Sequence, residues 1–222
     1  DREMKTSILT ILAYFIMCSV SYASDVYITQ SGASLTANIN QDGQTNRFGV
    51  SGTVVTLTGD SQVLDIDQIG NTNTIAASLI GAIQEFTLRQ AGSSNTSTVS
   101  VGSNSASGDN SIIETITGSS NTTTVNVGNS ASTDDADIDL TATGDSNTIT
   151  INENSTASMV GSDKKITSIT AIGSSNTITS THTGAADQDT TLHHTGASST
   201  FAITQGGAYD GTTSITTVGS GH

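Results

Sequence analysis

The chain has 222 residues, a net charge of −14 and only 12% charged residues. Nucleic-acid binding needs a basic face, so this composition argues against a nucleic-acid partner. The sequence contains no proline, and since proline is excluded from central strands, the chain could be almost entirely strand. A polar chain of low complexity can also be disordered, but the regular alternation described below favours a folded chain.

The N-terminal segment has the features of a secretory signal. Lys5 precedes an apolar stretch from Ile8 to Val20, and a cleavage site between small residues ends at Ala23. The apolar stretch is short and mixed for a membrane span. We therefore expect residues 1–23 to be a signal peptide with extra residues upstream, and residues 24–222 to form a single domain.

A short motif, Q-x-G-x-x-N, recurs along the rest of the chain. Its three full copies are Gln41/Gly43/Asn46, Gln68/Gly70/Asn73 and Gln90/Gly92/Asn95. Weaker copies keep the glycine and usually the asparagine: Gly118/Asn121, Gly144/Asn147, Gly173/Asn176, Gly196/Ser199 and Gly219. Successive glycines lie 22 to 29 residues apart, a period that indicates stacked repeats.

Apolar and polar residues alternate on both sides of each glycine turn. Leu64 and Ile66 lie two residues apart before one turn, and Ile75 and Ala77 do so after it. A period of two on both sides of a turn predicts strand, turn, strand. Because successive side chains of a strand point to opposite faces, we expect the apolar residues, the Gln and the Asn to point inward.

The two ends of each repeat differ along the chain. The first repeat begins with Val26 and Ile28 and continues through Gln30 to Gly32, and Ser51-Gly52-Thr53 is expected to form a bulge or a small insertion. From Asn73 onward, longer polar loops are expected opposite the tight turn. These loops are Gly102–Asn110, Gly128–Asp135, Glu153–Lys165, Thr183–Asp187 and Gln205–Gly211.

These elements predict an all-β protein without a helix after residue 24. The expected fold is a β-solenoid of about eight stacked coils, each strand–arch–strand, with two facing parallel sheets. Strands stack about 4.8 Å apart, so eight coils would rise roughly 38 Å. The inward Gln and Asn can then stack as amide ladders, and the glycines would allow a positive φ or a close backbone approach at each arch.

Few other residues are arranged for chemistry. His193 and His194 point to opposite faces of a strand and cannot share a metal, and His194 occupies an inward Gln position, where a ladder role is favoured. Asp65 and Asp67 are interpreted as surface charge. An acidic cluster could bind calcium weakly, although a solvated face is favoured. The residues of this cluster are Asp134, Asp135, Asp137 and Asp139.

Glu114 falls in an inward position of the repeat. Either it is a buried acid that needs a partner, or its strand is shifted by one residue so that Ile113 points inward, and we favour the shift. The sequence has no evident Ser-His-Asp spacing, metal tetrad or phosphate loop. We therefore expect neither an enzyme nor a bound cofactor or metal.

Alternating apolar residues that lead into Q-x-G-x-x-N resemble the curlin repeat of curli fibre subunits. The resemblance covers residues 25–219 and is strong at the three full copies. In later copies other residues replace Gln, which indicates a divergent member; these are Ile116, Ala142, Ala171 and Thr217. The resemblance implies a secreted subunit of an extracellular, amyloid-like filament in the biofilm matrix at the bacterial cell surface. An outer-membrane secretion channel and a nucleator are its implied partners.

The repeat also predicts self-association on physical grounds. The end strands of a solenoid present unpaired backbone groups. An N-terminal edge at Val26–Gln30 and a C-terminal motif copy at Gly219 have matching patterns, so one subunit could add to the next. Such a head-to-tail contact does not close on itself and therefore makes a filament.

Outward threonines support an alternative function. T-x-T pairs recur at Thr122/Thr124, Thr148/Thr150 and Thr177/Thr179. Regular threonine arrays of this kind resemble those of ice-binding β-solenoids, which would make the chain a secreted monomer that binds ice or a surface. The high strand propensity of threonine would also explain them.

Overall fold

A computed structural model describes residues 24–32, 34–49, 54–81, 84–102, 110–128, 136–154, 164–184, 187–207 and 211–221. The expected signal peptide, the expected bulge at residues 51–53 and most residues of the expected long loops lie outside these ranges. Every regular element within them is a β-strand. The described residues contain no helix long and apolar enough to cross a membrane.

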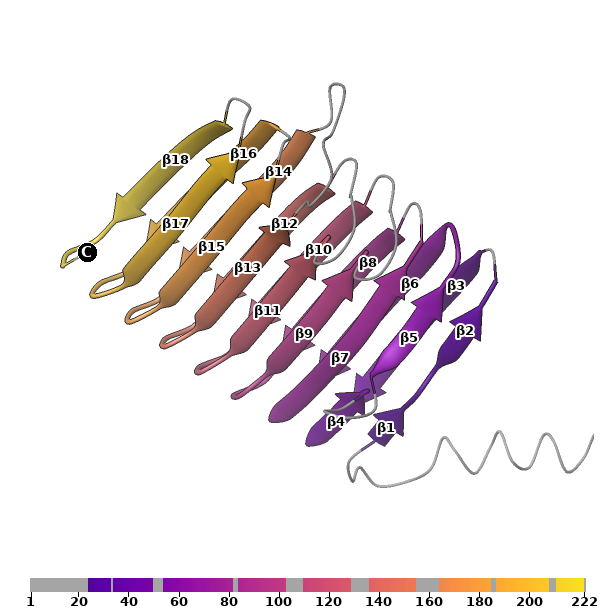
Figure 1. The fold of residues 1–222 in the computed structure, drawn as a ribbon. Coiled ribbons are helices and arrows are strands. Elements are labelled where there is room, and N and C mark those ends of the chain that lie inside the picture. Colours follow the sequence, from indigo (N-terminus) through magenta and orange to yellow (C-terminus); the bar gives the residue numbers. More distant parts are fainter. Residues whose placement is uncertain are drawn as a thin grey trace, which may run out of the picture.

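Two parallel sheets face each other along the whole stack (Figure 1). The strands of sheet A are β1 (Ser24–Val26), β2 (Thr29–Ser31), β4 (Thr45–Phe48), β5 (Val55–Thr58), β7 (Thr72–Ile80), β9 (Thr96–Val101), β11 (Thr122–Val127), β13 (Thr148–Asn154), β15 (Thr177–Gly184) and β17 (Thr200–Gly207). The strands of sheet B are β3 (Leu35–Asp42), β6 (Gln62–Ile69), β8 (Gln84–Ala91), β10 (Asn110–Thr117), β12 (Ala136–Thr143), β14 (Lys164–Ile172), β16 (Asp187–Thr195) and β18 (Gly211–Val218). The predicted β-solenoid of two parallel sheets is confirmed.

The coils are not all alike. From β7–β8 to β17–β18 the described chain forms six coils of two continuous strands, against the eight or so expected. In the first two coils the strand of sheet A is divided, into β1 and β2 and then into β4 and β5. The second division surrounds the position of the expected insertion, because β4 ends at Phe48 and β5 begins at Val55.

The core fills the narrow space between the sheets. Strand β8 shows the pattern, with Gln84, Phe86, Leu88 and Gln90 buried and the residues between them more exposed. Equivalent residues of successive coils stack into columns that run along the solenoid, and burying one large apolar side chain contributes about 1.5–3 kcal/mol. One coil holds too few such residues to be stable alone, so stability comes from stacking.

Glu114 corrects one expectation. Its side chain is fully buried between the sheets, whereas Ile113 is 42% exposed on the outer face. The favoured one-residue shift of this strand was therefore wrong. The reason is register: β10 pairs with β8 over its whole length, and Glu114 lies beside Leu88. A one-residue slip would have turned Ile112 and Ile116 outward.

Candidate functional site

A column of asparagine side chains runs through the arches that join sheet B to sheet A. Asn46 donates its side-chain amide to Asn73 Oδ1 at 3.2 Å, and Asn73 donates to Asn95 Oδ1 at 3.0 Å. In later coils Asn121 Nδ2 donates to Asn147 Oδ1 at 2.9 Å. The predicted asparagine positions are thus brought together in one hydrogen-bonded line.

The later part of this column also uses backbone donors. The N–H of Asn147 donates to Asn176 Oδ1 at 2.9 Å, and that of Asn176 donates to Ser199 Oγ at 3.0 Å. Asn121 Nδ2 also donates to the carbonyl of its own arch glycine, Gly118, at 2.7 Å. A buried polar group left without a partner costs about 1–3 kcal/mol, so the repeated spacing removes this penalty coil by coil.

The glutamines of the full motif form a shorter column in sheet B. Gln68 Nε2 donates to Gln41 Oε1 at 2.6 Å, and Gln90 Nε2 donates to Gln68 Oε1 at 3.0 Å. His194 holds the same column position in β16, is 1% exposed, and places Nε2 2.9 Å from Ser199 Oγ. Gln30 does not belong to this column, because it lies in sheet A beside the opposite arch at Gly32.

The arch glycines stack backbone against backbone. A Cβ added to Gly118 would lie 1.5 Å from the carbonyl oxygen of Gly92, and one added to Gly70 would lie 2.0 Å from that of Gly43. The same contact repeats along the predicted arch glycines Gly144, Gly173, Gly196 and Gly219. Close approach is therefore the common reason for glycine, and these later arches and Gly118 also have a positive φ.

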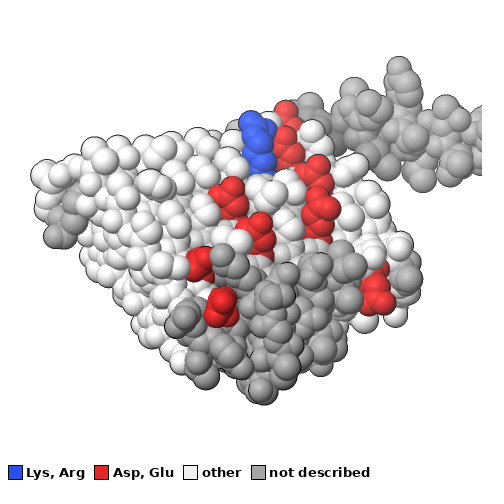
Figure 2. Space-filling view, turned by 90° about the horizontal axis from the view of Figure 1, so that it is seen from above, with Lys and Arg blue, Asp and Glu red and all other residues white. Residues whose placement is uncertain are grey.

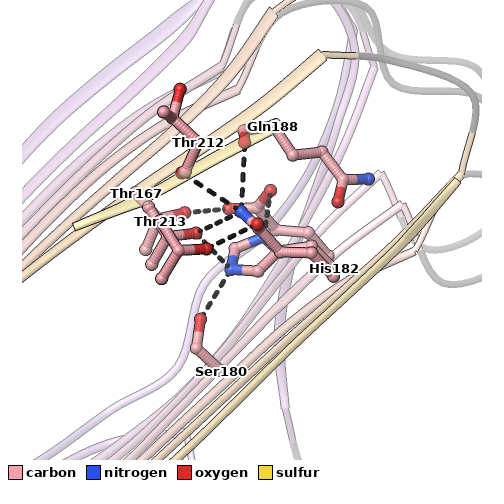
Figure 3. Close-up of polar contacts among 9 residues, drawn as sticks. Thr167, Ser180, His182, Gln188, Thr212 and Thr213 are labelled. Carbon is pink, nitrogen blue, oxygen red and sulfur yellow. Dashed lines mark hydrogen bonds and ion pairs between the residues drawn. The ribbon is translucent and has the colours of Figure 1, made fainter. Parts of the chain in front are cut away.

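A buried polar cluster in the last coils was not anticipated from the sequence (Figure 3). His182 places Nδ1 3.0 Å from Glu153 Oε2 and Nε2 2.6 Å from Ser180 Oγ. Thr167 donates a hydrogen bond to the other oxygen of Glu153. Thr190 Oγ1 lies 3.1 Å from His182 Nε2. Nδ1 of His182 therefore faces an oxygen acceptor of Glu153, and the two hydroxyls lie at Nε2.

The cluster continues towards the C-terminal end of the solenoid. Gln205 Nε2 donates to Thr190 Oγ1 at 3.1 Å and to the carbonyl of Gln188 at 3.0 Å. Thr213 of the exposed last strand donates to Gln205 Oε1 at 2.5 Å. A chain of hydrogen bonds therefore connects the end of the stack to the buried Glu153.

A sequence signal for this cluster does exist. Glu153, His182 and Gln205 each lie nine residues after an arch glycine. They were expected in or beside loops, but β13, β15 and β17 extend far enough to hold them in one inward column. The hydrogen-bonded sequence Ser180–His182–Glu153 has the same residue types as a hydrolase triad. All three side chains are at most 1% exposed, so Ser180 is closed to a substrate in this folded state.

The two ends of the stack present matching columns. Register pairing carried from strand to strand places Phe201 of β17 in the same column as Val26 of β1. It likewise places Gln205 in the column of Gln30. In sheet B, Ile215 of β18 shares a column with Ile39 of β3.

The outer faces of the two sheets differ in charge. Sheet B carries exposed acidic residues, which include Asp65, Asp137 and Asp139, and Asp67 pairs with Arg89 at 2.8 Å. Figure 2 shows such carboxylates gathered on one face of the molecule, with a basic group beside them. Asp134 and Asp135 of the expected acidic cluster lie outside the described residues. In the described part of the chain, no three His, Cys, Asp or Glu side chains are grouped so that they could hold a metal.

The T-x-T pairs lie on the outer face of sheet A. Thr124 pairs in register with Thr98 and Thr150, and Thr150 pairs with Thr179, so the threonines of neighbouring strands form straight rows. His193 lies on the outer face of sheet B and is exposed, on the opposite face of its strand from His194.

These features define the class of protein as a parallel β-solenoid with polar ladders inside and matching columns at its two ends. Comparisons with protein-family models, with curated proteins and with solved structures find no match to this chain.

Proposed function

We propose that this chain is a structural subunit, not an enzyme, which polymerises head-to-tail into an extracellular, amyloid-like filament. One observation carries the proposal: the inward columns of β17 and β18 have the same register positions as those of β1, β2 and β3. A second copy placed beyond β18 would continue every column, with Phe201 meeting Val26, Gln205 meeting Gln30 and Ile215 meeting Ile39.

The described ends are energetically suited to such an addition. Ile215 is 50% exposed and Val218 is 60% exposed on the last strand of sheet B. An edge strand also presents a row of backbone donors and acceptors that another strand can pair with. Adding a copy would bury this apolar surface and complete both backbone ladders, and because the contact joins unlike ends, it repeats without closing.

Gln30 adds a specific reason for this joint. Its Oε1 atom is buried and has no hydrogen-bond partner. Gln205 of another copy would stack beside it in the same column, but its Nε2 already donates to Gln188 and Thr190 within its own chain. The buried, unpaired acceptor therefore leaves this end of the stack incomplete, and a donor from an added strand would have to satisfy it.

The resemblance to curlin repeats extends the proposal to location and partners. The filament would be secreted through an outer-membrane channel, start on a nucleator and contribute to the biofilm matrix and to surface adhesion. The net charge of −14 would keep free subunits apart and slow premature association before export.

Cysteine cross-linking tests the joint at residue level. Thr204 and Thr29 share a column on the outer face of sheet A. Strands stacked about 4.8 Å apart are within disulfide range. In a chain whose Cys18 is replaced by serine, Thr29→Cys/Thr204→Cys should give covalent multimers under oxidation, seen as a ladder on a non-reducing gel.

A register control makes this test specific. Asp25→Cys/Thr204→Cys displaces one cysteine by four residues along the strand, roughly 13 Å, and should give no ladder. Electron microscopy should show filaments with a subunit rise of roughly 38 Å, eight strand spacings. Equal ladders from both pairs, or no filaments from the unsubstituted chain at high concentration, would overturn the proposal.

A further inference from the structure

Charge is segregated between the two outer faces of the solenoid. From β7 to β17, no outward residue of sheet A in the described chain is Asp, Glu, Lys or Arg. The outer face of sheet B, by contrast, carries Asp65, Glu85, Asp137 and Asp139 as exposed acids. Two copies of so acidic a chain can therefore approach closely at sheet A, where no like charges have to be buried.

The same face of sheet A is built from short side chains in straight rows. One row runs from Thr74 on β7 to Thr200 on β17, one threonine on each strand. The second row contains Thr98, Thr124, Thr150 and Thr179. Strands about 4.8 Å apart and residues two positions apart along each strand give a regular lattice of methyl and hydroxyl groups.

We propose that this threonine face binds the threonine face of a second copy of the chain, so that filaments associate in pairs, sheet A against sheet A. Flat faces of identical short side chains can interdigitate as a dry interface between paired sheets. The contact is symmetric, with the same patch on both partners. The inference rests on the proposed filament, because pairing of filaments is its main consequence.

The size of the threonine face explains why filaments would pair stably although free subunits would pair only weakly. Six strands at about 4.8 Å and about six residues at 3.3 Å give on the order of 600 Å² for each copy. The total, on the order of 1,200 Å², is at the lower limit of a stable interface, so free subunits would pair weakly. In a filament every subunit repeats the contact, and the contacts add as in multivalent binding.

The test compares charge placed on the two faces. Thr124→Glu/Thr179→Glu puts two carboxylates on the threonine face, on β11 and β15. The matched control, Thr115→Glu/Thr170→Glu, puts them on the outer face of sheet B, on β10 and β14. By electron microscopy, unsubstituted and control filaments should be paired. Thr124→Glu/Thr179→Glu filaments should be single, with about half the width.

A second measurement tests whether the threonine faces of two copies bind each other when filaments cannot form. Ile215→Lys should be tolerated in the free chain, because Ile215 is 50% exposed there, but it would block the joint by burying a charge. At high concentration, sedimentation equilibrium should show dimers of Ile215→Lys, and only monomers when Thr124→Glu/Thr179→Glu is added. Dimers of this kind without any filaments would overturn the proposed function and leave the pairing intact.

Two outcomes would overturn the pairing itself. One is that unsubstituted filaments are single, or that Thr124→Glu/Thr179→Glu filaments remain paired. The other is that Ile215→Lys stays monomeric while it inhibits ice growth, and that this inhibition is lost in Thr124→Glu/Thr179→Glu. The second result would assign the threonine face to ice.

Discussion

His182 places Nδ1 3.0 Å from Glu153 Oε2 inside the solenoid, in a column that is apolar from Leu57 of β5 to Val127 of β11. Val101 and Val127 hold the positions before Glu153. The pair therefore ends the apolar run of this column, and Gln205 continues the polar part in the next coil. The hydrogen bonds of the pair are satisfied by each other and by the hydroxyls around them.

Removing one member of this pair should destabilise the fold strongly. Glu153→Val leaves the buried His182 Nδ1 and the Thr167 hydroxyl without their acceptor, and each buried polar group left unpaired costs about 1–3 kcal/mol. Glu153→Val/His182→Leu restores an apolar column and should cost roughly 2 kcal/mol less than the single change. Denaturant unfolding of Glu153→Val, His182→Leu and the double variant measures the three losses. If the losses of the two single variants simply added up to that of the double variant, the residues would not be coupled.

Glu114 should make stability depend on pH. Burial raises the pKa of Glu114 to about 8, and a hydrogen bond from Ser97 offsets only part of this. Between the ordinary pKa of 4.5 and about 8, the folded chain keeps a proton that the unfolded chain has released. The free energy of unfolding should therefore fall by about 1.4 kcal/mol per pH unit in this range. This contribution is complete below pH 4.5 and lost above about pH 8.

Glu114→Gln isolates this effect from other titrating groups. The amide keeps the size of the side chain and an acceptor for Ser97, but it does not ionise. The stability difference between Glu114→Gln and the unsubstituted chain should grow as pH rises from 5 to 8, and a constant difference would contradict the assignment. Leu88 and Leu140 flank Glu114 in its column, so Glu114→Leu should also be more stable than the unsubstituted chain at pH 8.

An alanine at an arch should disrupt the stack. In Gly118→Ala the new Cβ would lie 1.5 Å from the carbonyl oxygen of Gly92, at a φ of +147°. The backbone of two coils would have to separate, and we expect a loss of roughly 3 kcal/mol or more. Gly206→Ala is the control, because nothing lies within 4 Å of its added Cβ. Thermal unfolding should lower the Tm of Gly118→Ala only, and equal effects would count against the backbone contact.

Inward and outward asparagine side chains should contribute different amounts to the stability of the fold. Asn147→Ala removes the acceptor of Asn121 Nδ2 and the donor to Gly144. Because its buried partners are left unpaired, we expect the free energy of unfolding to fall by about 2–4 kcal/mol. Asn152→Ala removes a single hydrogen bond to Asn126 on the outer face and should cost at most about 1 kcal/mol. Urea midpoints compare the two variants. A loss for Asn152→Ala as large as for Asn147→Ala would contradict the ladder as the source of stability.

Much of the fold could be predicted because the two sequence patterns that specify it, the apolar–polar alternation and the arch motif, are local. The alternation around Leu64 and Ile66 specifies strands, and the motif at Gln68–Asn73 specifies the arch. Glu114 was misplaced because its residue type conflicts with an inward position, and the pairing of β10 with β8 prevailed. The structure shows that Ser97 supplies the one hydrogen bond that Glu114 makes across the core.

By itself, the sequence determined the strand–arch–strand unit, the inward faces and the arch positions, since each depends on residues within one repeat. Only the tertiary structure decided how far each strand extends, and therefore that the position nine residues after an arch glycine belongs to an inward column and not to a loop. The repeats differ in length, so this outcome depends on the stacking of neighbouring strands and not on residues within one repeat. Stacking places Glu153 beside His182 and Gln205 in the column of Gln30. The polar cluster and the matching ends follow from that register.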